Sequence, residues 1–317
     1  MTLPTDILEN PVRTEGSVAD QLALLVSPAT VIRCDEPLAG HTTLRVGGPA
    51  DVYVEPASEE ELAAVVNFCG GREIVFFVLG RGSNLLVRDG GYRGVVISLS
   101  QPAFCKIEVA GQKLRCGAGA KVKNVVIEAR RHGLSGLEFL EGIPGSVGGA
   151  LRMNAGAMGG ATFDVVESVR LMDFDGNIRE LAPEKMAPKY RGCDLLKHHI
   201  ALGAVLKGRA DSPESIAQRM SSFSRKRWAS QPAAPSAGCI FKNPPAIPAG
   251  KLIDELGLKG ARAGGAVVSQ EHGNFIVNDG SATARDVLDL IEIVKSKVKA
   301  ERGIELQTEV EIIGEDS

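Results

Sequence analysis

Residues 141–160 read EGIPGSVGGALRMNAGAMGG, a segment in which glycine recurs every few positions. A backbone with so few Cβ atoms lets a large, extended ligand lie close to the chain. A second glycine-containing turn, LGRGSNLLV at 79–87, follows an apolar run, and consecutive N–H groups in such a turn can form a nest that binds an anion. The two segments together favour a protein that holds a dinucleotide through its pyrophosphate.

Neither glycine-rich segment has the spacing of a familiar nucleotide motif. The Rossmann fingerprint G-x-G-x-x-G at the start of a helix is missing, and so is the phosphate loop G-x-x-x-x-G-K-[ST]. Each segment alone is also typical of tight turns between packed strands. The pair indicates a bound dinucleotide without saying which one.

The composition describes a globular protein and argues against two classes of partner. A chain of 317 residues with 44% hydrophobic and 24% charged residues can form two or three units around buried cores. The net charge of -3 lacks the basic excess of a nucleic-acid-binding protein. No run approaches the ~18 apolar residues of a membrane span, so membrane insertion is not expected.

The cysteines and the N-terminal residues point to the cytoplasm. The six cysteines contain no C-x-x-C pair, and with five histidines they show no zinc or iron–sulfur spacing, so no metal site is expected. Residues 1–16 carry acidic side chains without an apolar core, which is unlike a signal peptide. The simplest interpretation is a cytoplasmic protein with reduced thiols, expected to be a monomer.

The chain is expected to divide into three units, 1–100, 101–210 and 211–317, in an α+β fold. The first unit opens with a polar lead-in through residue 40 and continues as an α/β unit. Its expected elements are a helix at 19–25, a helix that starts at a capping box of Ser58 and Glu61, and strands at 50–54, 74–79 and 95–99. The continuous apolar run at 74–79 is typical of a strand that is covered on both faces.

The second and third units show different patterns. The second alternates short strands with turns around one helix, at 122–132. A connecting helix at 212–227 and a Pro/Ala/Ser segment at 231–236 lead into the third unit. Its expected elements are a helix at 249–256, a strand at 274–277, a long helix at 284–302 capped by Thr283 and Asp286 and ended by Gly303, and a final strand at 306–313.

Three short motifs carry chemistry that suits an anionic substrate. SAGCIFKNP places the thiol of Cys239 near the cation of Lys242 and the amide of Asn243. KYRG adds Arg191, and TEVEIIG adds Glu309. Taken alone, each residue also has an ordinary explanation, such as a surface ion pair, a solvated strand residue or a small buried thiol.

Six motifs follow one another along the chain: HTTLRVGGPAD (41–51), LGRGSNLLV, GLEFLEGIPGSVGGALRMNAGA (136–157), KYRGCDL (189–195), SAGCIFKNP and EHGNFIVN (271–278). Together they make about residues 20–314 resemble the UDP-N-acetylenolpyruvoylglucosamine reductase family, in its shorter type II form. It implies the FAD-binding architecture of the vanillyl-alcohol oxidase group, with two subdomains that hold FAD non-covalently and a following α/β substrate-binding domain. It also implies NADPH-dependent reduction of a UDP-sugar enolpyruvyl group to UDP-N-acetylmuramate, and with it a part in peptidoglycan synthesis, cell shape and cell division.

The resemblance also implies which residues bind the cofactor and the substrate. The residues expected along FAD are Gly80, Arg81, Gly82, Ser83, Asn84, Leu85, Gly145, Ser146, Gly148, Gly149, Asn154, Ala155 and Gly156. The residues expected to contact the substrate are Tyr190, Lys242, Asn243, His272 and Asn274. His272 and Asn274 also fit an ordinary turn. The basic run Arg225–Arg227 beside Trp228 is usually a solvated face, but it could help to hold a diphosphate.

The chemistry of this reaction gives each catalytic residue a role. Hydride addition to the enolpyruvyl ether leaves negative charge beside a carboxylate, which needs a cation, a hydrogen-bond donor and a proton. Arg191 matches the family's catalytic arginine, Glu309 its carboxylate near the C-terminus, and Cys239 stands in place of its proton-donating serine. A thiol with a pKa of about 8.5 is mostly protonated at neutral pH, so we expect Cys239 to replace that serine. Cys193 also stands where serine is expected, which would weaken a hydrogen bond there.

Two other functions stay open on the sequence. One is an oxidase of the same flavin fold, which often tethers FAD through His or Cys. Cys116 and His132 lie in or near the flavin half, but in no loop that matches such a tether. The other is a non-catalytic nucleotide-binding protein, which would be favoured if Arg191 or Glu309 lay outside the flavin pocket.

Overall fold

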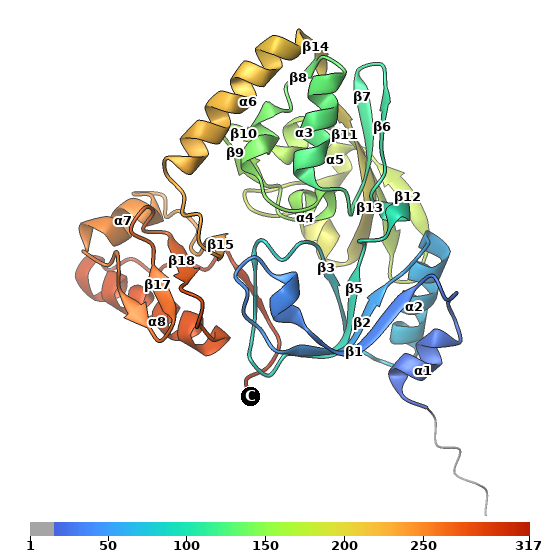
Figure 1. Cartoon of the computed structure of the whole chain (residues 1–317), viewed down its shortest axis with the longest axis horizontal. Helices are drawn as coiled ribbons and strands as arrows, with labels where there is room; N and C mark the ends of the chain where they lie inside the picture. Colours follow the sequence, from blue (N-terminus) through green and yellow to red (C-terminus); the bar gives the residue numbers. More distant parts are fainter. Residues whose placement is uncertain (1–15) are drawn as a thin grey trace, which may run out of the picture.

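The N-terminal part of the chain forms a four-stranded sheet in this computed structural model, which describes residues 16–317 (Figure 1). Its elements, with those beside them, are α1 (Val18–Ala23), β1 (Val31–Pro37), η1 (Leu38–His41), β2 (Pro49–Glu55), α2 (Glu59–Gly71), β3 (Phe76–Leu79), β4 (Leu85–Val87), β5 (Tyr92–Ser98) and η2 (Pro102–Phe104). The strand order is β1-β2-β5-β3, in which β2, β5 and β3 run parallel and β1 pairs antiparallel with β2.

Two local expectations in this part need correction. The segment expected as a polar lead-in contains β1, and its residues 1–15 lie outside the described part of the chain. The middle of β1 is exposed at the edge of the sheet, so its sequence lacks the alternation of a half-buried strand. The capping box of α2 is half formed: Ser58 Oγ accepts from the Glu61 N–H, but the Glu61 carboxylate accepts from the N–H groups of Ser27 and Ala57.

The apolar run at 74–79 contains a strand, but the expectation that both of its faces are covered is wrong. Val75 is 60% exposed, and Phe76, Phe77 and Val78 are half-buried. β3 is the last strand of its sheet, and these three half-buried residues line the large cavity described below. The apolar pattern therefore belongs to a cavity wall and not to the middle of a core.

The second part of the chain is built on an antiparallel five-stranded sheet. Its larger elements are β6 (Ile107–Ala110), β7 (Lys113–Gly117), α3 (Val122–Arg131), α4 (Val147–Arg152), β11 (Val166–Asp173), β12 (Ile178–Leu181) and β13 (His199–Lys207), and the strand order is β12-β11-β13-β7-β6. The shorter elements are β8 (Leu134–Ser135), η3 (Glu138–Gly142), β9 (Gly156–Ala157), β10 (Gly160–Ala161), η4 (Thr162–Asp164), α5 (Pro183–Met186), η5 (Asp194–Lys197) and β14 (Arg209–Ala210). Val125 of α3 and Leu151 of α4 share one buried core with side chains of β7, β11 and β13.

The long helix α6 (Pro213–Trp228) leads from the second part to the third (Figure 1). The elements of the third part are β15 (Ser236–Cys239), α7 (Ala249–Glu255), β16 (Arg262–Ala263), β17 (Ala266–Val268), β18 (Phe275–Asn278) and α8 (Ala284–Arg302), with the strand order β15-β18-β17-β16.

The predicted start and end of the helix α8 are both confirmed. Thr283 and Asp286 form the complete capping box, and Gly303 ends the helix with a φ of 66°. The side chains predicted to face inward, Val287, Ile291, Val294 and Val298, are at most 1% exposed. Within residues 16–317, neither this helix nor any other has the length and apolar character that a membrane crossing requires.

The chain ends by returning from the third part to the first. β19 (Glu311–Ile313) pairs in parallel with β4, in the register Glu311 to Leu85. The final strand expected over 306–313 is therefore shorter than predicted. Leu306 is buried in the core of the third part, and only the last three residues of the segment reach β4.

A carboxylate of the first part also binds the start of α8. Asp89, two residues after β4, accepts hydrogen bonds of 2.8 Å from the backbone N–H groups of Ala284 and Arg285. These are free donors at a helix N-terminus, where a negative charge is favoured by the helix dipole. The first and third parts are thus joined both by strand pairing and by a helix cap.

We predict that Asp89→Ala lowers the free energy of unfolding by about 0.5–2 kcal/mol, because two N–H donors of α8 lose their acceptor. Chemical denaturation at neutral pH measures the change. Asp289→Ala on the exposed face of the same helix is the matched control, expected within about 0.5 kcal/mol of the unsubstituted chain. Equal effects of the two substitutions would contradict a special role for Asp89.

Candidate active site

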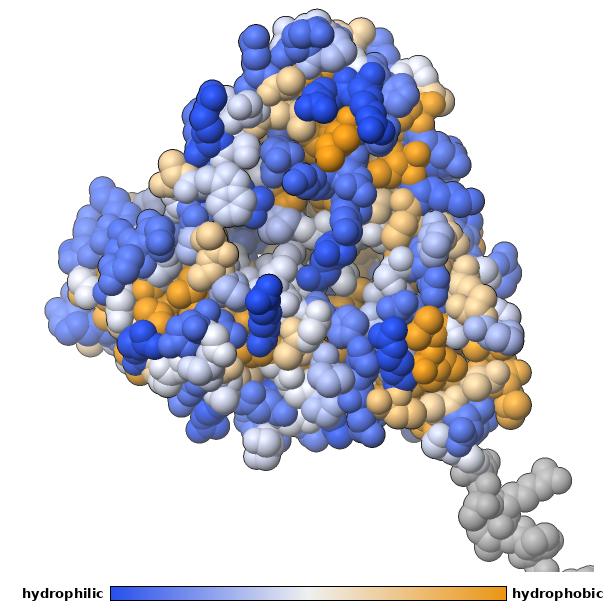
Figure 2. Space-filling model, viewed as in Figure 1, coloured by the Kyte–Doolittle hydropathy of each residue, from blue (hydrophilic) through white to orange (hydrophobic). Residues whose placement is uncertain are grey.

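A cavity of about 1410 Å³ lies where the three parts of the chain meet. Figure 2 shows the depression at the centre of this face of the molecule. Both glycine-rich loops line the cavity, and so do Arg191, Cys239 and Glu309. Motifs that are far apart in the sequence therefore share one site.

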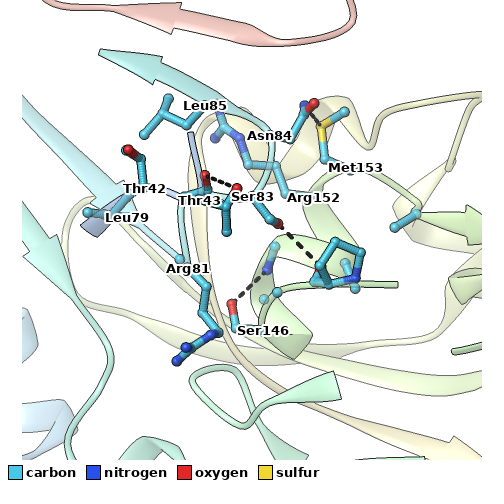
Figure 3. Close-up of a pocket in the computed structure, with 18 of the residues that line it drawn as sticks. Thr42, Thr43, Leu79, Arg81, Ser83, Asn84, Leu85, Ser146, Arg152 and Met153 are labelled. Atoms are coloured by element: carbon cyan, nitrogen blue, oxygen red, sulfur yellow. Dashed lines mark hydrogen bonds between the residues drawn. The ribbon is translucent and has the colours of Figure 1, made fainter. Parts of the chain in front are cut away.

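The two glycine-rich loops contact each other on the wall of the cavity (Figure 3). Ser83 Oγ donates to Pro144 O at 3.3 Å. A Cβ on Gly80 would lie 3.0 Å from Ser146 Oγ, and a Cβ on Gly145 would lie 2.9 Å from Ser83 Oγ. Side chains at these two positions would therefore crowd the serine of the opposite loop, so glycine allows the two loops to approach closely.

The turn at Gly82 has unpaired backbone donors on the cavity wall. Gly82 has a φ of 58°, and a Cβ there would lie 2.3 Å from His41 O. Its carbonyl accepts from the backbone N–H and the hydroxyl of Thr43. Within residues 16–317, the N–H groups of Arg81–Ser83 have no hydrogen-bond partner. Three consecutive free N–H groups in a glycine turn suit a pyrophosphate.

Thr43 connects this turn to the third part of the chain, a link that the sequence analysis missed. Its hydroxyl donates to Ser236 O at 2.7 Å, and the buried Asn278 donates to Leu44 O at 3.1 Å. The motif HTTLRVGGPAD was quoted for the resemblance, but no pattern within it indicates which of its residues bind another domain.

Arg191 and Glu309 form an ion pair on the cavity wall. Arg191 Nε lies 2.9 Å from Glu309 Oε1, and the two side chains are 23% and 10% exposed. Both backbone groups of Glu309 are hydrogen-bonded. Its N–H donates to Ile240 O at 2.7 Å, and its carbonyl accepts from Asn84 Nδ2 at 3.1 Å. The Arg191 Nε–H is shielded from solvent and poorly aligned with Glu309 Oε1, so charge holds this pair more than a well-aligned hydrogen bond does.

The electrostatic environment keeps the thiol of Cys239 neutral. Burial and the nearby Glu309 raise the pKa of Cys239 to about 11, against smaller lowering effects of Arg191 and Asn274. Burial also raises the pKa of Glu309, and the positive charges of Arg191 and Lys242 oppose that shift. The site thus contains a protonated thiol, a carboxyl group that takes up a proton more readily than usual, and a fixed cation.

The backbone turn that carries Arg191 is held tightly. Arg191 has a φ of 57°, which is unfavourable for a residue with a side chain. Lys189 and Gly192 close the turn with reciprocal backbone hydrogen bonds of 2.8 and 3.2 Å. Asn154 Nδ2 donates to Lys189 O at 3.2 Å, and Asn154 Oδ1 accepts from the Phe163 N–H.

Asn154 is accordingly used inside the protein and does not line the cavity, although it was predicted to contact the cofactor. The other predicted cofactor residues, from Gly80 to Leu85 and from Gly145 to Gly156, do line it. Cys193 is buried, and its thiol donates to Met186 O at 3.3 Å, so a hydrogen bond remains where the replacement of serine was expected to weaken one.

The five residues predicted to bind the substrate do not line the cavity. Asn243 Oδ1 accepts from the Ala249 N–H at the start of α7, and the side chain of Asn274 exchanges two hydrogen bonds with the backbone of Phe241. Of the remaining three, Tyr190 is 64% exposed, and Lys242 and His272 are half-buried. Their contacts with a substrate stay predictions.

The charged residues of the cavity wall that were not predicted include Arg45, Lys121 and Arg152. Arg227, from the basic run considered for a diphosphate, also lines the cavity. Cys116 and His132, considered as attachment points for a flavin, do not line the cavity. The location of Arg191 and Glu309 on its wall argues against a non-catalytic protein that has lost its reactive groups.

Comparison with known proteins identifies the family. Residues 50–182 match the FAD binding domain family, and residues 231–313 match the C-terminal domain of UDP-N-acetylenolpyruvoylglucosamine reductase. The UDP-N-acetylenolpyruvoylglucosamine reductase of Syntrophomonas wolfei subsp. wolfei is 43% identical over 291 residues, which are 91% of this chain and 97% of that protein. The reductase of Clostridioides difficile is 44% identical over 287 residues, 90% of this chain and 94% of that protein.

A solved structure supports the same assignment. The crystal structure of UDP-N-acetylenolpyruvylglucosamine reductase from Thermus caldophilus superimposes with a TM-score of 0.77 at 42% identity, over 89% of this chain and 98% of that one. The predicted α+β class and the FAD-binding module are thereby confirmed. The chain belongs to the UDP-N-acetylenolpyruvoylglucosamine reductase family of FAD-dependent oxidoreductases.

Proposed function

We propose that Arg191, Glu309 and Cys239 act directly on the enolpyruvyl group of UDP-N-acetylglucosamine enolpyruvate, which this chain reduces to the peptidoglycan precursor UDP-N-acetylmuramate. The observation that carries the proposal is the Arg191–Glu309 ion pair, 2.9 Å from Nε to Oε1, on the wall of the cavity that also contains Cys239. A cation, a carboxyl group and a neutral thiol are the groups that this reduction requires.

The two glycine-rich loops are proposed to hold FAD through its pyrophosphate. The free N–H groups of Arg81–Ser83 supply hydrogen bonds, and Gly80 and Gly145 let the two loops lie close together around the same group. Arg81 and Lys121 on the cavity wall add positive charge for the same group. Once NADPH has reduced it, bound FAD supplies the hydride for the substrate.

Arg191 is proposed to bind the substrate carboxylate. Its guanidinium presents several donors in a fixed plane, and it lines the cavity beside Glu309. The carboxyl group of Glu309 lies beside this guanidinium, and burial raises its pKa. In its protonated form it can donate a hydrogen bond to the oxygen on which negative charge develops.

Cys239 is proposed to give the proton that completes the reduction. With a pKa of about 11, the Sγ–H remains protonated at neutral pH and is available for transfer to the carbon beside the carboxylate. The thiolate left behind lies close enough to Arg191 for that charge to stabilise it. Solvent can then return the proton.

The remaining expectations concern substrate contacts and cellular context. Lys242 lies near enough to Glu309 to lower its pKa, so we propose that it contacts an anionic part of the UDP-sugar. Tyr190, Asn243, His272 and Asn274 are proposed contacts on the resemblance alone. A cytoplasmic location is proposed because the six cysteines are all free in the described chain, and a monomer is proposed on the resemblance alone.

The proposed reaction is tested in two steps without oxygen. The purified protein is reduced with one equivalent of NADPH, and UDP-N-acetylglucosamine enolpyruvate is then added while the flavin absorbance is followed. We expect the oxidised spectrum to return on addition of the substrate. A flavin that stays reduced until air is admitted would instead indicate an oxidase.

Substitution of Cys239 tests the proton donor. We predict that Cys239→Ala slows reoxidation of the reduced flavin by the substrate by about 100-fold or more, the usual contribution of a positioned acid. Cys239→Ser should retain substantial activity, because a hydroxyl can occupy the same position. If the alanine variant is as fast as the unsubstituted chain, the proton comes from another group.

The raised pKa of Cys239 also predicts its reactivity. The thiolate is the form that alkylates, so iodoacetamide should modify Cys239 slowly at pH 7 and faster as the pH rises toward about 11. Mass spectrometry of peptides measures the rate at each pH, with the exposed Cys34 as internal reference. Rapid modification of Cys239 at neutral pH would contradict a neutral thiol.

A further inference from the structure

Arg152 contacts both of the segments that carry Arg191 and Glu309. It is the last residue of α4, the short helix within the second glycine-rich segment, and it lines the cavity. Figure 3 shows its side chain beside Asn84 and Met153.

One set of contacts ties Arg152 to the Arg191 turn. The Arg152 carbonyl accepts from the Cys193 N–H at 2.9 Å, and Arg152 Nη1 donates to Leu196 O at 3.1 Å. Cys193 comes directly after the turn in which Arg191 has its unfavourable φ of 57°, and Leu196 lies in η5, the element that follows. A residue in this conformation depends on its surroundings to keep its place.

The other contact ties Arg152 to the segment of Glu309. Arg152 Nη2 lies 2.6 Å from Glu311 Oε1, and the Glu311 N–H donates to Asn84 O at 3.1 Å. Glu311 begins β19, and the residues after it are held by Arg88 and by the backbone of Gly90 and Gly91, so the ion pair with Arg152 fixes the Glu309 side of this strand. The side chains of Arg152 and Glu311 are 35% and 34% exposed, and ion pairs this exposed contribute little to stability.

We infer that Arg152, through Glu311 and Leu196 O, is a positioning residue that sets the geometry of the Arg191–Glu309 pair for reduction of the substrate. The inference rests on the proposed function of that pair. A small displacement of a group that must meet the reacting atoms reduces the rate far more than it reduces stability. Arg152 therefore affects the step in which the substrate reacts more than the step in which NADPH reduces the flavin.

The test measures the two half-reactions separately by stopped flow, on the FAD-loaded variants Arg152→Gln, Arg152→Lys and Glu311→Gln. We expect Arg152→Gln to slow reoxidation of the flavin by UDP-N-acetylglucosamine enolpyruvate by about 10–100-fold, with reduction by NADPH changed by less than about threefold. Arg152→Lys keeps the charge and cannot hold both acceptors in one plane, so its effect should be intermediate. Arg152→Gln combined with Glu311→Gln should be no slower than Arg152→Gln alone.

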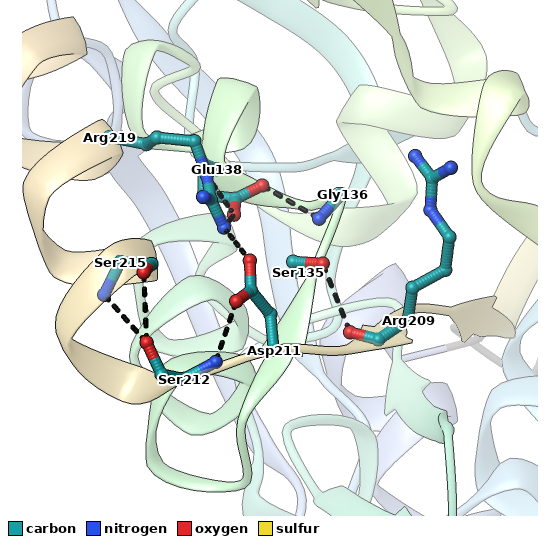
Figure 4. Close-up of polar contacts among 8 residues, drawn as sticks. All are labelled: Ser135, Gly136, Glu138, Arg209, Asp211, Ser212, Ser215 and Arg219. Carbon is teal, nitrogen blue, oxygen red and sulfur yellow. Dashed lines mark hydrogen bonds and ion pairs between the residues drawn. The ribbon is translucent and has the colours of Figure 1, made fainter.

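Arg219→Gln is the matched control for an arginine with a structural role. Arg219 joins α6 to Glu138 and Asp211, with distances of 2.9 Å from Nε to Glu138 Oε1 and 2.6 Å from Nη2 to Asp211 Oδ2 (Figure 4). It is 42% exposed and does not line the cavity. This variant should lose thermal stability and keep the ratio of the two half-reaction rates.

The outcomes separate the inference from the proposed function. If the unsubstituted protein is not reoxidised by the substrate, the proposed function fails and the positioning role fails with it. If it is reoxidised but Arg152→Gln slows both half-reactions equally, or changes only thermal stability as Arg219→Gln does, Arg152 is structural and the inference is wrong. Selective loss of the second half-reaction in both Arg152 variants supports it.

Discussion

The pairing of β19 with β4 is the constraint on which the site depends. It brings residues from the end of the chain against the turn that carries the free N–H groups of Arg81–Ser83. Asn84 lies between them. Its side-chain Nδ2 donates a hydrogen bond to Glu309 O, and its backbone carbonyl accepts one from the Glu311 N–H. Without this short parallel ladder, Glu309 would have no fixed position relative to the cofactor loops, and the three reactive residues would not share one cavity.

Burial and charge act against each other at the reactive groups. Burial raises the pKa values of Glu309 and Cys239, and the guanidinium of Arg191 opposes both shifts. The positive charge of Arg191 therefore limits how far burial raises the pKa of each of these two acids, Glu309 and Cys239. The arrangement favours proton transfer from the thiol at the moment when negative charge develops on the substrate, since the cation can then stabilise the thiolate.

The sequence predicts those parts of the structure whose signals are local. The helix α8 has caps and an apolar face within its own residues, and its bounds agree with the prediction. The edge strand β1 and the open face of β3 depend on which strands lie beside them, and no local pattern records that. The resemblance led to Arg191, Cys239 and Glu309, but the internal hydrogen bonds of Asn154 could not be read from a motif, because motifs do not say where an amide points.

The return of the chain to β4 also has a consequence for biosynthesis. Asn84 and Glu309, which are hydrogen-bonded, lie 225 positions apart, so almost the whole chain must leave the ribosome before they can meet. The sheet that precedes β4 can form much earlier, and contacts over such a separation are slow to establish. During translation the nascent chain would therefore pass through a stage in which the cofactor loops exist while the carboxylate opposite them is still inside the ribosomal tunnel.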